Sequence, residues 1–213
     1  MYKVIFAVIF ICICGCGTTE PPIEEIPVIV IDTNSVNGNI AYEYLNFVRS
    51  NPEQNRCENC NFERYLPQKP LKVNYSLQTV AWKRAADMAT NGYTSLLDTA
   101  NVGIDMRVAQ FGYKFDSTNY DKSTSNYGTA TYSYSNSGNV DIKSMIDDLI
   151  RGPGRFSDGE EFNRYNNSQR LLMGLNENSR LDEIGIGFCY SYNKSTNSNY
   201  KYYLCVIVAK QKE

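Results

Sequence analysis

The sequence predicts an α+β domain in which helices cover both faces of a mostly antiparallel sheet. Apolar residues recur at three- and four-residue steps in four segments, whereas two strand-like runs flank a polar turn near the end of the chain. The helical patterns precede the strands without regular βαβ alternation, which favours α+β over a parallel α/β fold. The chain has 213 residues, of which 42% are hydrophobic and 21% charged, enough for one domain with a real core.

Two long helices are predicted first. In NIAYEYLNFVRSNPE (39–53) apolar side chains share one helical stripe, and Asn51-Pro52 ends the helix. That stripe consists of Ile40, Tyr44, Leu45 and Val48. The strongest helical pattern follows Ser76, the expected N-cap, and ends at Gly92, which suits the C′ position. Its stripe consists of Leu77, Val80, Ala81, Ala85, Met88 and Ala89.

Two shorter helices follow. Ile104 to Phe111 predicts one, stopped by Gly112. VDIKSMIDDLI (140–150) predicts the other, and Gly152-Pro153-Gly154 ends it. The apolar face of this second helix consists of Ile142, Met145, Ile146 and Leu149.

Three strands complete the predicted domain. Residues 125–135 alternate and are rich in Thr and Tyr, which favours a strand. Residues 181–192 and 199–210 form the two arms of a hairpin. The second arm contains LCVIV, which is apolar on both faces, so this strand is expected to be central and covered on two sides.

The first residues are typical of an export signal. After Lys3 an apolar run reaches Cys14, too short for a membrane span and right for a secretory signal. Gly15 before Cys16 resembles a bacterial lipobox, in which Cys16 becomes the lipidated first residue of the mature chain. An ordinary cleaved signal is the alternative.

A tether is predicted between the signal and the domain. TTEPPIEEIP (18–27) has three prolines and three glutamates, which favour an extended, solvated chain. VIVIDT after it is apolar enough for a short strand. We therefore expect a signal at 1–15, a tether at 16–38 and a domain at 39–213.

The cysteines support export. Three of the seven lie in the signal region, which leaves an even number: Cys57, Cys60, Cys189 and Cys205. This favours disulfides. Cys189 and Cys205 flank the hairpin turn and are expected nearly opposite each other, and Cys57 and Cys60 would close a local loop. The alternatives for the CxxC are half of a zinc site or a redox pair.

The absence of histidine excludes several kinds of chemistry. The chain contains no histidine, so Ser-His and Cys-His nucleophile pairs are ruled out. The net charge is −2, the pI is about 5.4, and no basic block is present, which argues against a nucleic-acid partner.

The order of motifs carries a resemblance. A helix ending LNFVRSNP is followed by SLQTVAWKRAADMATNGY, an Arg and Gly-Tyr pattern, an aromatic strand, a helix and EIGIGFCYSY…YYLCVIV. From Asn39 to Lys210 the chain resembles the CAP superfamily of cysteine-rich secretory proteins, venom allergens, plant pathogenesis-related proteins and bacterial secreted proteins. The resemblance implies a three-layer α-β-α sandwich.

The chain departs from that family in the cleft. Many members have two histidines and two glutamates there, and some bind a divalent metal. The resemblance places the first histidine at Leu96, the first glutamate near Tyr127-Gly128-Thr129, and the second histidine at Gln169, just before Arg170, or at Arg155. The remaining glutamate has Asp147 or Asp148 as its counterpart. The expected cleft-lining residues are Ser95, Leu96, Asp98, Tyr127, Gln169, Arg170 and Glu183.

The missing ligands favour binding over catalysis. Imidazole titrates near pH 7 and binds metals while neutral, which Leu and Gln cannot do. We therefore expect no catalytic residue, metal or cofactor, and a lipid-anchored surface module that binds a protein, glycan or lipid. The alternative is an extracellular hydrolase that uses carboxylates only. Its candidates would be Asp98, Asp105, Asp147, Asp148, Glu160, Glu161 and Glu183.

Overall fold

The computed structural model describes residues 28–31, 36–55, 66–115, 125–126, 128–136, 140–151, 171–174, 181–192 and 200–212. The predicted signal and several predicted residues lie outside these ranges: Cys16, Cys57, Cys60, Tyr127, Arg155, Glu160, Glu161, Gln169 and Arg170. Within them the chain combines helices with a mixed sheet, which confirms the α+β class.

All four predicted helices and the predicted strands are present. The helices are α1 (Val36–Ser50), α2 (Tyr75–Asn91), α3 (Ile104–Gln110) and α4 (Ile142–Arg151), with a 3₁₀ turn η1 (Pro52–Asn55). The strands are β1 (Val28–Ile31), β2 (Lys72–Val73), β3 (Thr129–Asn136), β4 (Glu183–Tyr192) and β5 (Tyr200–Ala209). Both β1 and the start of α1 precede residue 39, so the segment expected as a tether contributes a strand to the sheet.

The sheet is mixed, which corrects the expectation of a mostly antiparallel one. Its order is β1-β4-β5-β3 with antiparallel pairing, and β2 also pairs with β4, in parallel. Sequence reasoning missed β2 because its two residues are too few to show an alternating pattern.

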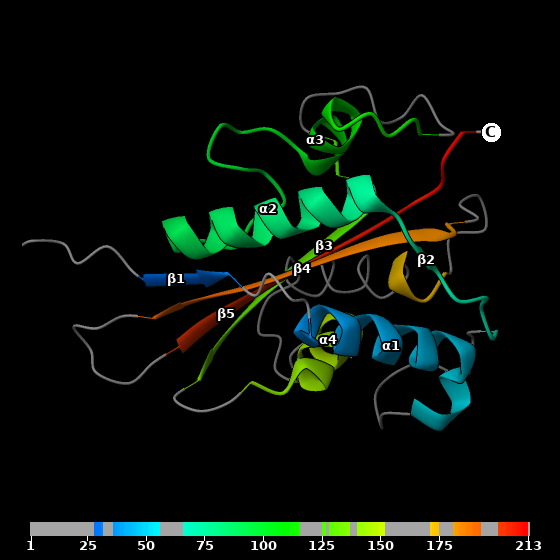
Figure 1. Ribbon diagram of the computed structural model, residues 1–213. Helices are drawn as coiled ribbons and strands as arrows, with labels where there is room; N and C mark the ends of the chain where they lie inside the picture. The colour runs from blue at the N-terminus through cyan, green and yellow to red at the C-terminus, as the bar shows by residue number, and fades with distance from the viewer. Residues whose placement is uncertain are drawn as a thin grey trace, which may run out of the picture.

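Helices lie on both faces of this sheet. Figure 1 shows α2 and α3 on one side and α1 and α4 on the other. Alternate side chains of β5 enter two separate cores. Leu204, Val206 and Val208 pack with α1 and α4, whereas Tyr203, Cys205 and Ile207 pack with α2 and α3. The central, doubly covered position predicted for this strand is confirmed.

The predicted buried stripe of α2 is confirmed, and so is its C-terminal glycine, but the N-cap prediction is wrong. Gly92 has φ 69°, the left-handed conformation expected after a helix. The N-cap is Asn74, whose side-chain oxygen accepts hydrogen bonds from the backbone N–H groups of Ser76 and Leu77. Asn caps a helix as well as Ser does, so composition alone does not choose between the two.

The side of α1 that is buried differs in part from the prediction. Leu45 and Val48 are buried as expected, but Ile40 is 37% exposed. The helix presents Ala41, Leu45 and Val48 to the core and turns Ile40 outward. A small alanine on the buried face is a weaker signal than a large isoleucine, which explains the error.

Candidate functional site

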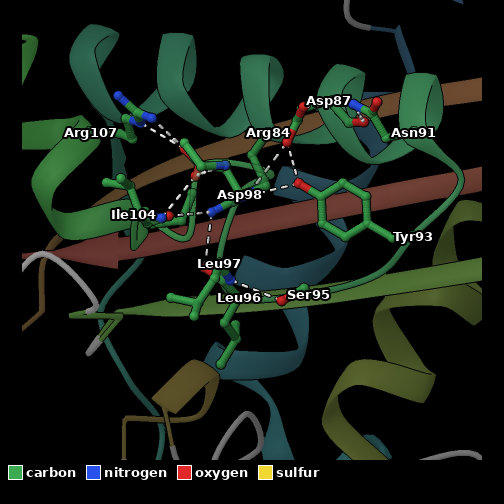
Figure 2. Close-up of polar contacts among 12 residues, drawn as sticks. Arg84, Asp87, Asn91, Tyr93, Ser95, Leu96, Leu97, Asp98, Ile104 and Arg107 are labelled. Atoms are coloured by element: carbon green, nitrogen blue, oxygen red, sulfur yellow. Dashed lines mark hydrogen bonds and ion pairs between the residues drawn. The ribbon is translucent and has the colours of Figure 1, made fainter.

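The loop after α2 is organised around Arg84, a buried cation of that helix. Arg84 is only 3% exposed, and its Nη2 atom donates to the carbonyl oxygens of Leu96 (2.9 Å) and Val102 (3.2 Å). Figure 2 shows Arg84 of α2 beside the loop that passes through Asp98. A guanidinium carries five N–H donors in a fixed plane, so one side chain fixes both ends of the loop.

Asp98 fixes the tip of the same loop. Its Oδ1 atom accepts backbone N–H groups from Ala100 (2.9 Å) and Val102 (2.8 Å), the geometry of an aspartate that closes a turn. Its Oδ2 atom lies 2.8 Å from Nε and 2.6 Å from Nη2 of Arg107, which comes from α3. The loop is therefore joined to α2 through Arg84 and to α3 through Asp98 (Figure 2).

These contacts keep Asp98 ionised. Burial alone would raise the pKa of Asp98, but the Val102 N–H and the Arg107 guanidinium stabilise the carboxylate and hold the pKa below its usual value of 3.8. The group is an acceptor with its bonds already made, which is the reverse of what a general acid requires.

Tyr93 and Asp87 extend the network along α2. The Tyr93 hydroxyl donates to Oδ2 of Asp87 and accepts from Nη1 of Arg84 at 3.1 Å, while Asn91 donates to Oδ1 of Asp87 at 2.9 Å. Burial and the bond to Asp87 raise the pKa of Tyr93 to about 12. The Tyr93 hydroxyl therefore stays protonated and acts as a fixed donor to Asp87.

A pocket of about 350 Å³ opens between α2, α3 and this loop. Val80 and Ile104 supply apolar side chains to the lining. Lys83 also lines the pocket, and its Nζ atom lies 4.4 Å from the centroid of the Phe111 ring. The volume falls within the ordinary range for small-ligand sites, roughly 300–1,000 Å³. The lining carries three cations and two carboxylates: Lys83, Arg84, Arg107, Asp87 and Asp98.

Of the predicted cleft residues that the structure describes, only Asp98 lines this pocket. Ser95 instead accepts the Leu97 N–H at 3.0 Å in a local turn, and Leu96 contributes its carbonyl to Arg84. Glu183 begins β4 and accepts from Asn74 (3.0 Å) and from the Tyr113 hydroxyl (2.6 Å). The structure does not bring Glu183 to the Asp98 pocket.

Asp147 and Asp148, two further candidate carboxylates, also make structural hydrogen bonds. Asp147 accepts from the Tyr44 hydroxyl at 2.9 Å, and Asp148 accepts from the Tyr132 hydroxyl at 2.6 Å. Both bonds fasten α4 to its neighbours, α1 and β3. Asp105 is 1% exposed within α3.

Cys189 and Cys205 lie on the same face of the hairpin, but the prediction that they sit opposite each other is wrong. Cys189 pairs with Tyr203, and Cys205 pairs with Gly187, so the register is two residues from the expected one. Diagonal neighbours lie about 7–8 Å apart, beyond the usual Cα separation of a disulfide, about 4.4–6.8 Å. Both are buried thiols, and no disulfide joins them.

Sequence reasoning missed the organising residue of the site. Position 84 follows Val80 by four residues and precedes Met88 by four, so Arg84 interrupts an otherwise apolar stripe. A cation at such a position must find buried acceptors, and the nearest polar backbone is the loop that follows the helix. That interruption was the signal available in the sequence.

In the described ranges no three Cys, Asp or Glu side chains gather closely enough to hold a metal ion. Nor does that part of the chain contain a helix long and apolar enough to cross a bilayer. No model of a known protein family matches the chain, and no curated protein matches it.

Proposed function

We propose that the chain is an exported CAP-like domain, lipid-anchored through Cys16, that acts as a non-catalytic binding module at the cell surface. The motif order of the sequence supports this proposal, as do the helices on both faces of the sheet, which match the three-layer sandwich of that superfamily. Cys16 precedes Val28, the first residue of β1, by twelve residues in the sequence.

The state of Asp98 is the observation that carries the proposal. A carboxylate-only hydrolase needs one carboxyl group with a raised pKa as acid and a second as base or nucleophile. Asp98 has a lowered pKa and is held by Arg107 and two backbone N–H groups. Glu183 accepts from Asn74 and Tyr113 instead of facing the pocket. Asp98, Glu183, Asp147 and Asp148 thus all make hydrogen bonds that hold the scaffold together.

The pocket beside Asp98 suits a ligand that carries a negative charge. Arg84 and Arg107 are engaged by the loop and by Asp98, whereas among the described residues the only contact found for Lys83 is with the Phe111 ring. A carboxylate on the ligand would pair with Lys83 while its apolar part contacts Phe111, Val80 and Ile104. Peptide-bearing wall polymers offer such groups.

The test separates binding from hydrolysis. The full chain is incubated with insoluble peptidoglycan sacculi, and the sedimented protein and the released soluble sugar are both measured. We expect retention without sugar release, and retention reduced about fivefold or more in Lys83→Ala. Lys143→Ala is the matched control, because Lys143 also lies over an aromatic ring, that of Tyr44, but outside the pocket.

Sugar release that disappears in Asp98→Asn would establish the hydrolase and overturn the binding module. Equal retention of Lys83→Ala and Lys143→Ala would remove the Asp98 pocket from the proposal. The anchor is tested separately, by cell fractionation of Cys16→Ala, which should leave the membrane fraction or stay unprocessed. Unchanged membrane retention, with a mature N-terminus elsewhere, would refute lipidation.

A further inference from the structure

A second pocket, of about 490 Å³, opens where α1 and α2 meet around the edge of β4. These helices lie on opposite faces of the sheet, so they approach each other only past that edge (Figure 1). The walls come from the first turns of α1, the first half of α2, the end of β2, and Ile184 and Ile186 of β4. No lining residue is shared with the Asp98 pocket.

The floor of this pocket is the part of β4, residues 185–188, with which no described strand pairs on this edge. β2 pairs with Glu183 and Ile184, and β1 pairs with residues 189–192. Between them the Gln78 side chain takes the place of a strand residue: its Oε1 atom accepts the Ile186 N–H at 3.0 Å, and its Nε2 atom donates to the Ile186 carbonyl at 2.6 Å. Because Gln78 already holds both backbone groups of Ile186, an extended peptide could pair with β4 here only by displacing Gln78, which disfavours a peptide as the occupant.

The walls are aromatic and polar but uncharged. Tyr42, Tyr75 and Trp82 supply rings, and Asn39 and Thr79 supply an amide and a hydroxyl. Among the described lining residues there is no Asp, Glu, Lys or Arg. A charged ligand would lose hydration here without gaining a counter-charge. The pocket therefore favours a neutral ligand, in contrast to the Asp98 pocket, which five charged side chains line.

We infer that this pocket binds a neutral saccharide. A sugar ring has apolar C–H faces, which pack on aromatic rings, and a rim of hydroxyls, which bond to amides and hydroxyls. Tyr75 offers an exposed ring, 84% accessible, at the rim of the pocket. Trp82 is half-buried and adds a second ring to the lining for the apolar face of a sugar.

The inference rests on the proposed binding role and gives it a ligand class, but it uses none of the residues of the Asp98 pocket. Trp82 is the only tryptophan of the chain, so intrinsic tryptophan fluorescence reports on this pocket alone. The full chain is titrated with neutral oligosaccharides of glucose, xylose and N-acetylglucosamine. Oligogalacturonate and laurate serve as charged and acyl-chain probes.

We expect a saturable change of Trp82 emission with at least one neutral oligosaccharide and none with oligogalacturonate or laurate. Tyr75→Ala should weaken that binding about tenfold or more. Because Tyr75 is exposed, its loss should leave the fold intact. Tyr134→Ala is the matched control, because Tyr134 is an exposed tyrosine of β3, at the opposite edge of the sheet. This variant should bind the oligosaccharide with the affinity of the unmodified chain.

A chain that responds to no neutral oligosaccharide, or only to oligogalacturonate or laurate, would overturn the assignment, as would equal affinity in Tyr75→Ala and Tyr134→Ala. The two proposals fail separately. Lys83-dependent retention on sacculi without any sugar response of Trp82 would leave the binding module and remove the saccharide site. Hydrolysis that depends on Asp98, together with a sugar response that depends on Tyr75, would remove the non-catalytic binding module and leave the saccharide site.

Discussion

Gly187 of β4 and Ala81 of α2 lie in backbone contact. A Cβ built at Gly187 would come within 2.0 Å of the Ala81 carbonyl oxygen, and one at Gly185 would come within 2.1 Å of the Leu77 carbonyl carbon. Two glycines of the same strand thus let α2 lie directly on the sheet. This contact sets the height of α2, and with it the positions of Arg84 in one pocket and of Trp82 in the other.

Gly187→Ala should therefore destabilise the domain by about 3 kcal/mol or more, because neither backbone can move away without disturbing the core. Gly92→Ala is the comparison: it has a positive φ but no atom within 4 Å of the added Cβ, so it should cost only about 1 kcal/mol. Urea denaturation of both variants measures the difference. Equal losses would mean that the contact between α2 and β4 is looser than described.

Arg84→Met should loosen the loop that carries Asp98. The Leu96 carbonyl would lose the Arg84 donor and the Val102 carbonyl would keep only the Asp98 N–H, while the methionine keeps the apolar part of the packing, at a cost of about 2–4 kcal/mol. Arg84→Lys should recover only part of the loss, because one ammonium lacks the planar fork. Amide hydrogen exchange of residues 96–102 is the direct measurement. Unchanged protection in Arg84→Met would remove Arg84 as the organiser of the loop.

Asp98 should make the domain sensitive to acid. Its folded pKa lies below the ordinary 3.8, so the unfolded chain takes up the proton first as the pH falls. The stability it contributes is fully present above pH 3.8 and is lost as the pH falls through the depressed pKa. Asp98→Asn should be less stable than the unmodified chain at pH 7, and the difference should shrink below pH 3.8. A difference that stays constant down to the acid transition would contradict this linkage.

The sequence predicts elements with large apolar periodicity and misses features that depend on single polar side chains. The stripe of α2, the face of α4 and the central β5 follow from repeated burial, which leaves a pattern in the chain. By contrast, Gln78 stands in for a strand residue, and Arg84 bonds to carbonyls that lie 12 and 18 residues away in the sequence. Such bonds depend on how far α2 sits from its neighbours, which no periodicity records.

In the candidate site, too, some features were predicted from the sequence and others were missed. Asp98, a predicted cleft residue in the loop after Gly92, lines the pocket. Glu183 was grouped with it by analogy, but its hydrogen bonds hold the start of β4 to Asn74 and Tyr113. The hairpin register was also missed by two residues, because residues 193–199 give no pattern that fixes the exact pairing of the strands.

Cys189 and Cys205 should be unreactive thiols in the folded chain. Burial raises the pKa of Cys189 to about 11 and that of Cys205 to about 12, from an ordinary value of 9.0. At pH 8 roughly a thousandth or less of either side chain is thiolate, the form that reacts with alkylating agents, and both are also shielded from solvent. Iodoacetamide should label neither residue in the native protein at pH 8, and both once urea unfolds the chain without a reductant.

The raised pKa of the two thiols also lowers the free energy of unfolding in alkali, because the unfolded thiols ionise above pH 9 while the folded ones keep their protons. Cys189→Ala should therefore lose less stability above pH 9 than the unmodified chain does. Peptide mapping after labelling distinguishes these two residues from Cys57 and Cys60, for which a local disulfide stays a prediction. A Cys189–Cys205 linkage in the unreduced protein would mean that the two strands pair two residues away from the register described.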